Sequence, residues 1–197
     1  MDRQYAYELV IKLIKNKNLI KHSLAVEAIM RDLALDLNKK NSNFNNNLNI
    51  NKFDEDKWAI AGLIHDIDYE ETADDPLRHS LIGEKILKEN GFEEDVIYAV
   101  KVHNDAHGLP LINKMDIALF ASDPVSGLIV ASALINKEKE IKLINKDFVL
   151  NRYKEKSFAR GVNRTQILAC EKLGYDLEEF IDISLKAMQK IDKEIGL

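Results

Sequence analysis

The sequence predicts an all-α fold, a helical bundle, on two observations. Apolar residues recur three to four positions apart in every confident segment, which is the period of an amphipathic helix. Only three prolines and eight glycines interrupt the 197 residues, which is too few for a turn-rich β architecture. With 46% hydrophobic residues, the chain suits one domain, residues 1–197, with a sizeable core.

The periodic segments set the expected order of helices. We expect them at residues 3–16, 19–37, 54–68, 75–90, 93–107, 113–122 and 125–135. Asp75–Pro76 is typical of a helix start and Asn90–Gly91 of a helix end. Asp123–Pro124 predicts a kink or break, because the residue before a proline avoids helical geometry.

Two further regions complete the expected layout. Residues 38–53 are rich in asparagine, with eight between positions 38 and 51, and such a polar tract predicts a surface loop. Residues 136–197 are expected to form a C-terminal helical extension, in which Asn163 and Asp176 cap the last two helices.

Composition argues against several classes of function. The net charge of −5 gives no reason to expect a nucleic-acid polymer as partner. Cys170 is the only cysteine, so an internal disulfide and a cysteine-based zinc site are excluded, and we expect it to pack in the core. Residues 1–4 lack an apolar signal core and no apolar run approaches a membrane span. We therefore expect a cytoplasmic protein with no membrane partner.

Four of the five histidines share a helix face with apolar residues, and we expect their side chains to point inward. These are His22, His65, His79 and His103. The fifth, His107, follows the inward stripe near a loop and is expected at the surface. A buried imidazole needs a partner, so four separate hydrogen-bonded core histidines are the plain alternative to one shared site.

Two aspartates accompany the inward histidines. Asp66 follows His65 directly, and Asp123 lies at the predicted helix break after an apolar run. Neighbouring side chains on a helix diverge by about 100°, so His65 and Asp66 reach one ion only beyond the helix end or between its faces. Neutral histidine and ionised aspartate are both metal ligands, and shared coordination satisfies the whole set at once.

The order of these residues resembles the HD-domain superfamily of metal-dependent phosphohydrolases. The similarity rests on His22, then His65–Asp66, then Asp123, over roughly residues 5–135. The additional His79 and His103 resemble the two-metal branches of that superfamily. The chain is most similar to small single-domain bacterial members, and also resembles the bacterial diadenosine tetraphosphate hydrolases.

One departure concerns the branch that cleaves cyclic-di-GMP, where a His-His pair precedes a Gly-Tyr-Pro sequence. Here Asn104 follows His103, and residues 108–110 read Gly-Leu-Pro. This departure argues against cyclic-di-GMP as the substrate.

The resemblance implies a role for each motif residue. His22, His65, Asp66 and Asp123 would bind a first metal ion, and Asp66 would bridge to a second ion held by His79 and His103. Two divalent ions lower the pKa of a bridging water, so the nucleophile would be a metal-bound hydroxide. Asp66 is therefore the expected catalytic centre, and Asp68 could orient a histidine or the water, or be solvated at the helix end. The cofactor would be one or two divalent ions of Mn, Fe, Co, Ni or Zn, without excluding Mg.

The densest group of cations in this acidic chain lies in residues 152–164, called the basic segment below. It contains Arg152, Lys154, Lys156, Arg160 and Arg164. Arginine and lysine neutralise phosphates, so we predict that these five side chains bind the substrate's phosphates. The alternative is a solvated surface with no ligand.

The sequence therefore predicts a hydrolase that cleaves a phosphate ester or anhydride of a small phosphorylated substrate, most simply a nucleotide. Three alternatives stay open. The first is a mononuclear nucleotidase in which His79 and His103 are structural. The second is a metal or nucleotide sensor that binds without turnover, and the third is a structural helical module. The oligomeric state does not follow from the sequence.

Overall fold

The computed structural model describes residues 2–44 and 52–197, and the regular elements in this part of the chain are all helices. This confirms the predicted all-α fold. The α-helices are α1 (Arg3–Leu13), α2 (Lys17–Phe44), α3 (Glu55–Ile64), α4 (Tyr69–Thr72), α5 (Leu81–Glu89), α6 (Glu94–Val102), α7 (Lys114–Ile135), α8 (Lys146–Lys154), α9 (Arg164–Ile167), α10 (Leu177–Gln189) and α11 (Asp192–Ile195). The 3₁₀ helices are η1 (Asp105–His107), η2 (Ile141–Leu143) and η3 (Leu168–Leu173).

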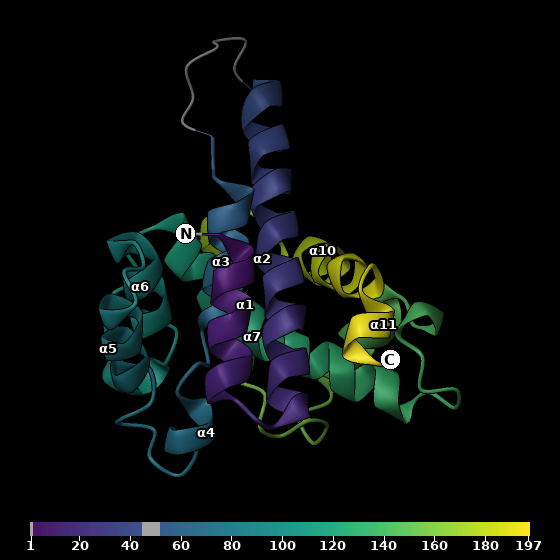
Figure 1. Cartoon of the computed structure of the whole chain (residues 1–197). Helices are drawn as coiled ribbons and strands as arrows, with labels where there is room; N and C mark the ends of the chain where they lie inside the picture. Colours follow the sequence, from purple (N-terminus) through teal and green to yellow (C-terminus); the bar gives the residue numbers. More distant parts are fainter. Residues whose placement is uncertain (1, 45–51) are drawn as a thin grey trace.

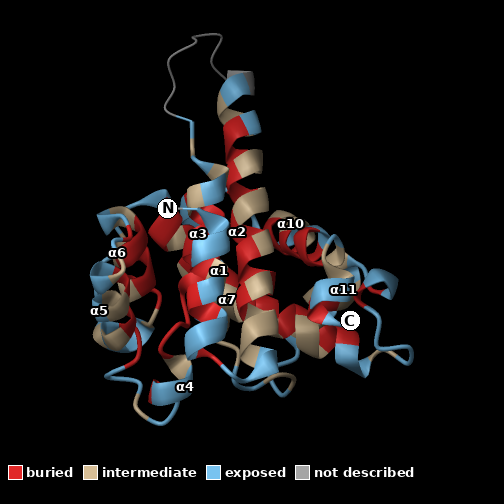
Figure 2. Ribbon diagram, in the orientation of Figure 1, coloured by how far each residue is buried: buried red, intermediate tan, exposed pale blue. Residues whose placement is uncertain are grey.

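The long helix α2 is the axis of the bundle, and the other helices are arranged around it (Figure 1). It contacts α3, α7, α10 and α11. Helices α5 and α6 lie on one side of it and α10 and α11 on the other, while α6 packs on α3 and α7. Buried residues from Ala6 to Ile195 form one continuous cluster between these helices (Figure 2).

A glycine sets the close approach of α2 and α3. A Cβ atom added to Gly62 would lie 2.7 Å from the carbonyl oxygen of Val26 on α2. The absence of a side chain therefore lets the two backbones touch. Since Val26 lies one turn after His22, and Gly62 just before His65, this contact brings the two histidines to the same place.

The predicted break at Asp123–Pro124 is wrong, because α7 continues through the proline. A proline inside a helix removes one hydrogen bond and costs about 3 kcal/mol. Ala121, Val125 and Leu128 are fully buried on both sides of it. Burial of these side chains against neighbouring helices offsets that cost.

Because the proline does not divide it, α7 is also long and apolar enough to cross a membrane, judged by length and hydropathy alone. Most of its apolar stretch is buried inside the protein, which is the position of a core helix. This differs from the expectation that no apolar run approaches a membrane span.

The predicted loop at residues 38–53 begins too early, because α2 extends to Phe44. Asn38 is buried, and its amide donates to the Phe53 carbonyl oxygen and accepts from the Phe53 amide, both at 2.8 Å. Lys40 lies 3.7 Å from the centre of the Tyr175 ring and pairs with Glu179 on α10. These contacts stabilise the last turns of α2. The rest of the asparagine-rich tract, residues 45–51, lies outside the described residues.

The predicted helix start at Asp75–Pro76 is also wrong, because α5 begins at Leu81. Residues 75–80 form hydrogen-bonded turns, with the amides of Arg78 and His79 donating to the Asp75 carbonyl. Ser80 then adopts a left-handed conformation, with φ at 66°, which a continuous helix does not allow. His79 therefore comes from a turn and not from a helix face.

Two helices end earlier than expected, each just before a histidine. Helix α3 ends at Ile64 with His65 as its C-cap, and α6 ends at Val102 with His103 as its C-cap. In the C-terminal extension, the side chain of Asn163 accepts from two amides at the start of α9. The side chain of Asp176 accepts from the Glu179 amide. Both predicted caps are confirmed.

Candidate metal centre

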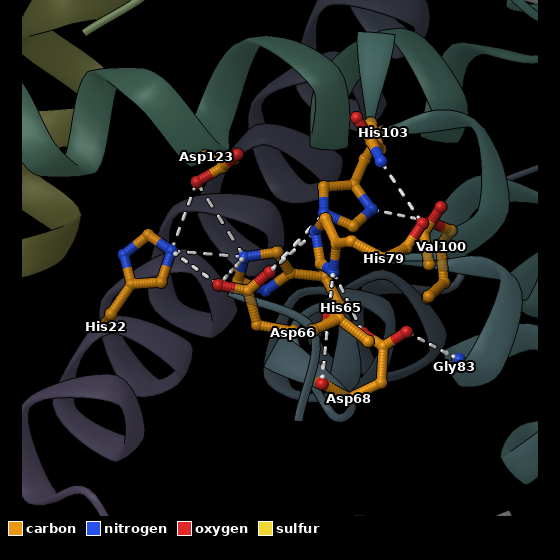
Figure 3. A network of polar contacts seen from close by, with 12 residues as sticks. His22, His65, Asp66, Asp68, His79, Gly83, Val100, His103 and Asp123 are labelled. Atoms are coloured by element: carbon orange, nitrogen blue, oxygen red, sulfur yellow. Dashed lines mark hydrogen bonds and ion pairs between the residues drawn. The ribbon is translucent and has the colours of Figure 1, made fainter. Parts of the chain in front are cut away.

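The six predicted metal ligands converge at one place, where the ends of several helices meet (Figure 3). His22 comes from α2, His65 and Asp66 from the end of α3, and His79 from the turn before α5. His103 follows α6, and Asp123 lies in the middle of α7. His65, Asp66, His79 and His103 are buried, while His22 and Asp123 are partly exposed.

Four of these side chains form a first ligand group, made of His22, His65, Asp66 and Asp123. The Nε2 atom of His22 lies 3.1 Å from His65 Nε2, 3.4 Å from Asp66 Oδ2 and 3.1 Å from Asp123 Oδ1. His65 Nε2 lies 3.4 Å from Asp66 Oδ2 and 3.8 Å from Asp123 Oδ1. His65 and Asp66 reach the same point because both lie beyond the last turn of α3.

The other carboxylate oxygen of Asp66 belongs to a second ligand group, made of Asp66, His79 and His103. Asp66 Oδ1 lies 3.4 Å from His79 Nε2 and 3.5 Å from His103 Nε2. The two histidine Nε2 atoms are 3.2 Å apart. Asp66 thus offers one oxygen to each group, which is the arrangement of a carboxylate that bridges two ions.

Backbone carbonyls determine which ring nitrogen carries the N–H in two histidines. His65 Nδ1 lies 2.8 Å from the Gly62 carbonyl oxygen, and His103 Nδ1 lies 2.5 Å from that of Val100. A carbonyl oxygen only accepts, so each ring donates from Nδ1 and the lone pair is on Nε2. The lone pairs therefore face the ligand groups.

Side chains fix the other two histidines in the same state. His79 Nδ1 donates to Asp68 Oδ1 at 2.9 Å. His22 Nδ1 lies 3.0 Å from the Ser126 hydroxyl, whose proton goes to the Asp123 carbonyl at 2.8 Å. The hydroxyl oxygen therefore accepts from His22, and when this ring is neutral its lone pair on Nε2 also faces the first ligand group.

The set of donors fits divalent metal ions. Metal bonds of about 2.0–2.2 Å to nitrogen and carboxylate oxygen place ligands about 3.0–3.5 Å apart around one ion. Most separations within each group have these values. Four lone pairs and two carboxylates that face one another need cations between them, since otherwise like partial charges meet in a buried site.

The pKa values of His22 and Asp66 also indicate that this buried cluster favours positive charge. Burial alone would lower the pKa of His22, but hydrogen bonds to Asp123 and Asp66 raise it to about 9. Burial alone would raise the pKa of Asp66, but His65, His103 and His22 hold it well below its usual range. The metal-free cluster therefore holds protons on histidine at neutral pH, which metal ions would displace on binding.

Asp68 supports a ligand instead of facing the substrate. Its side chain is fully buried, Oδ1 holds His79, and Oδ2 accepts from the Gly83 amide at 2.8 Å. The Thr72 hydroxyl donates to the Asp68 carbonyl at 2.9 Å and fixes the same turn. Of the two roles expected for Asp68, orienting a histidine is the one that this geometry fits.

A cavity of about 560 Å³ opens onto the cluster. Five of the six ligands line it, and His65 lies behind them. The other lining residues include Leu19, Tyr69, Asn104, Asp105 and Gln166. This volume lies within the range of small-molecule sites in proteins.

Several residues that the sequence did not single out hold the ligands in place. The Asn104 amide donates to the carbonyls of Pro76 and His79, at 2.7 and 3.1 Å. His107, expected at the surface, is half-buried and lies 2.8 Å from the same His79 carbonyl. Asn104 directly follows the predicted ligand His103. This neighbouring position was the one feature of the sequence that could have indicated its role.

Gln166, from α9, reaches the cluster from the C-terminal extension. Its amide donates to the His103 carbonyl at 3.2 Å. No local pattern indicates this contact, because 63 residues separate the two positions along the chain.

None of the five cations of the basic segment is among the residues that line the cavity. Arg164 donates to the carbonyl oxygens of Tyr153 and Phe158 at 2.7 Å and of Glu155 at 3.0 Å. Its guanidinium therefore closes the loop between α8 and α9. The predicted phosphate contact does not fit this residue, since its donors are engaged within the segment.

The other four cations of the basic segment are paired elsewhere or exposed. Arg152 pairs with Glu155 and lies over the rings of Phe148 and Phe158. The side chains of Lys154, Lys156 and Arg160 are exposed. Gly161 is the part of the segment that lines the cavity, so of the five cations Arg160 lies next to a lining residue in the sequence.

Comparison with known proteins supports this centre. Residues 19–144 match the HD domain family, and this stretch includes all six ligands. A stretch of 100 residues is 29% identical to an uncharacterised protein of Methanocaldococcus jannaschii, covering 49% of this chain and about half of that relative's length, 53%. No solved structure gives a significant match. Because the family match covers more than half of the chain, the protein belongs to the HD domain family, a family of metal-dependent phosphohydrolases.

Proposed function

We propose that the protein hydrolyses a phosphate ester or anhydride of a small phosphorylated molecule, such as a nucleotide, and that it uses two divalent metal ions. The observation that carries this proposal is the sharing of Asp66. One of its oxygens faces His22 and His65, and the other faces His79 and His103, at the wall of an open cavity.

Each group of residues has a defined task in this proposal. The first ligand group would hold one ion and the second ligand group the other, with Mn, Fe, Co, Ni or Zn favoured by the mixed histidine and carboxylate ligands. When bound, the ions would activate water and stabilise negative charge on the phosphoryl oxygens. Asp68 and Ser126 keep the lone pairs of His79 and His22 directed at the ions.

The cavity wall supports hydrolysis by water over covalent catalysis. Within the described part of the chain, Thr72 supplies the sole hydroxyl of a serine or threonine on the wall, and it already donates to Asp68. Cys170 is fully buried elsewhere, and burial raises the pKa of its thiol to about 11. Neither side chain is suited to act as a nucleophile.

The test combines metal analysis with a substrate panel. Protein made without a histidine tag is loaded with each candidate metal and assayed on nucleoside phosphates, dinucleoside polyphosphates and cyclic nucleotides. We expect turnover that Asp66→Asn reduces by more than about 100-fold, because a direct ligand matters more than an outer contact. Asp147→Asn, which removes an exposed acid on α8, is the matched control and should keep activity.

The outcomes separate the alternatives. Metal binding without turnover of any phosphate ester or anhydride would indicate a sensor. Less than about 0.2 ion per chain, not restored by added Mn or Fe, would leave a structural helical module, because a buried ligand set of this kind binds transition metals when intact.

A further inference from the structure

The cavity over the metal centre is lined by acidic and neutral side chains. Among the described residues on its wall there is no lysine or arginine. Besides the ligands, its charged side chain is Asp105, which lies at the exposed rim and accepts from the Asn163 amide at 2.8 Å. The metal ions would therefore supply the positive charge of the site.

Several cations on the elements around the cavity are engaged elsewhere. Lys101 pairs with Glu84 at 3.0 Å, and Arg78 pairs with Glu71 at 2.9 Å. The two engaged arginines of the basic segment, described above, bind their own loop. Arg160, next to the lining Gly161, is the remaining candidate in that segment for a second phosphate contact.

Charge balance then limits the substrate. Two divalent ions with the carboxylates of Asp66, Asp68 and Asp123 would leave a net charge of about +1. A phosphate monoester carries about −2 at pH 7 and already offsets this charge. Each further phosphate group adds negative charge that no cation on the wall offsets, and at the rim it would meet Asp105.

We propose that the site selects substrates with a single terminal phosphate group, and that Asp105 disfavours polyphosphate chains. This inference rests on the proposed function and narrows it to phosphate monoesters. The remaining wall suits an organic group of modest polarity, since Leu19, Ala73 and Pro76 offer apolar surface and Asn104 offers an amide.

The first test compares substrates that differ in phosphate number alone. The kcat/KM of the Mn-loaded protein is measured for one nucleoside as its 5′-monophosphate, diphosphate and triphosphate, at a fixed concentration of free Mn²⁺. We expect the monophosphate to exceed the triphosphate by at least about tenfold, since like charges in a partly enclosed site repel. An equal or reversed order would overturn the inference and leave hydrolysis itself standing.

Two variants test the assignment to Asp105. Asp105→Asn keeps an oxygen for the Asn163 contact and removes the charge, so the ratio of monophosphate to triphosphate kcat/KM should fall roughly three- to tenfold, most at low salt. Asp147→Asn removes the same charge far from the wall and should leave the ratio unchanged. An unchanged ratio in Asp105→Asn, or a selective loss of triphosphate turnover in Arg160→Ala, would refute the assignment.

Binding gives a readout that does not depend on turnover. Calorimetry on the Mn-loaded protein compares inorganic phosphate with tripolyphosphate, again at fixed free Mn²⁺. Tighter binding of phosphate supports the inference even if no substrate in the panel is hydrolysed. Tighter binding of tripolyphosphate contradicts it. Failure to bind either anion, together with no turnover, contradicts both this inference and the proposed function.

Discussion

The metal centre and the basic segment differ in how their charged side chains are held. The centre draws on α2, α3, α6, α7 and the turn before α5, and each histidine ligand has a partner behind it. The basic segment supplies its cations from one stretch of chain, and its two best-held arginines face that stretch itself. The basic segment has the higher density of charge in the sequence, yet of the two regions the metal centre forms the converging site.

The difference follows from the cost of burial. A buried imidazole or carboxylate is unstable without a partner, so an inward position in the sequence already implies a contact. An exposed lysine or arginine is stable in water without any partner, so a run of them implies little. Position on a helix face therefore predicts a site better than charge density does.

The largest expected effect concerns the contact that brings α2 and α3 together. Gly62→Ala places a methyl group 2.7 Å from the Val26 carbonyl oxygen, and backbone must shift to admit it. We expect a loss of about 1–3 kcal/mol in the free energy of unfolding, together with weaker metal binding, because His22 and His65 separate. Thermal unfolding and metal titration measure the two effects.

Gly83→Ala is the matched control for this change. A Cβ atom at Gly83 would lie 3.5 Å from the Asp68 carboxylate, which is an ordinary contact. This variant should keep both stability and metal. Equal behaviour of the two alanine variants would show that close helix approach is not what assembles the first ligand group.

The next effect tests whether the side chain that holds His79, Asp68, affects metal affinity. Asp68→Ala removes the acceptor of His79 Nδ1 while leaving every metal ligand in place. Affinity for the ion of the second ligand group should fall by about 10–100-fold, while the first ligand group keeps its ion. Competition with a chelator measures both affinities. Loss of both ions to the same degree would assign Asp68 a role in folding and not in positioning His79.

The next effect, in the basic segment, concerns stability alone and not metal binding. Arg164→Ala removes three hydrogen bonds to carbonyl oxygens at 3.0 Å or less, so we expect stability to fall by roughly 1–3 kcal/mol. Lys154→Ala, at an exposed position, should change stability little. Metal content should be unchanged in both variants. A selective rise in KM for a phosphorylated substrate in Arg164→Ala, without loss of stability, would restore the predicted phosphate contact.

The smallest expected effect is a dependence of the stability of the metal-free protein on pH. The pKa of His22 rises from 6.5 to about 9 in the folded state, although burial opposes this, because Asp123 and Asp66 stabilise the charged ring. Its stabilising contribution is therefore complete below pH 6.5 and is lost as the pH rises through 9. The Tm measured with a chelator should fall over this range. His22→Gln should flatten that fall, and an unchanged slope would remove His22 as its cause.

The sequence allowed the fold class to be predicted, and the convergence of the candidate metal ligands, because both depend largely on local pattern. Helical spacing identified His22, His65 and His103 as inward residues, and the structure brings them together. His79 joins them from a turn, although the helix from which it was predicted begins after it. Because neighbouring side chains diverge, His65 and Asp66 could meet one ion beyond a helix end or between helix faces. The structure shows the first arrangement, because α3 ends at Ile64. These predictions need only the period of the helix and the cost of burying polar groups.

What could not be predicted depends on contacts between distant segments. From the local sequence, Pro124 predicts a helix break. Only the packing of α7 against neighbouring helices explains why the helix continues through this proline. Asn38 looks like part of a polar loop until its two hydrogen bonds to Phe53 are known. Gln166 and Ser126 support ligands across long stretches of chain, so the sequence around them carries no signal.

The central claim is that Asp66 is shared by two ions, and counting ions tests it most directly. Elemental analysis of tag-free protein loaded with Mn should give about two ions per chain in the wild type. His79→Ala and His103→Ala should each lower this to about one, because each removes a ligand of the second ligand group. One ion per chain in the wild type and in both variants would contradict the account and favour a mononuclear centre.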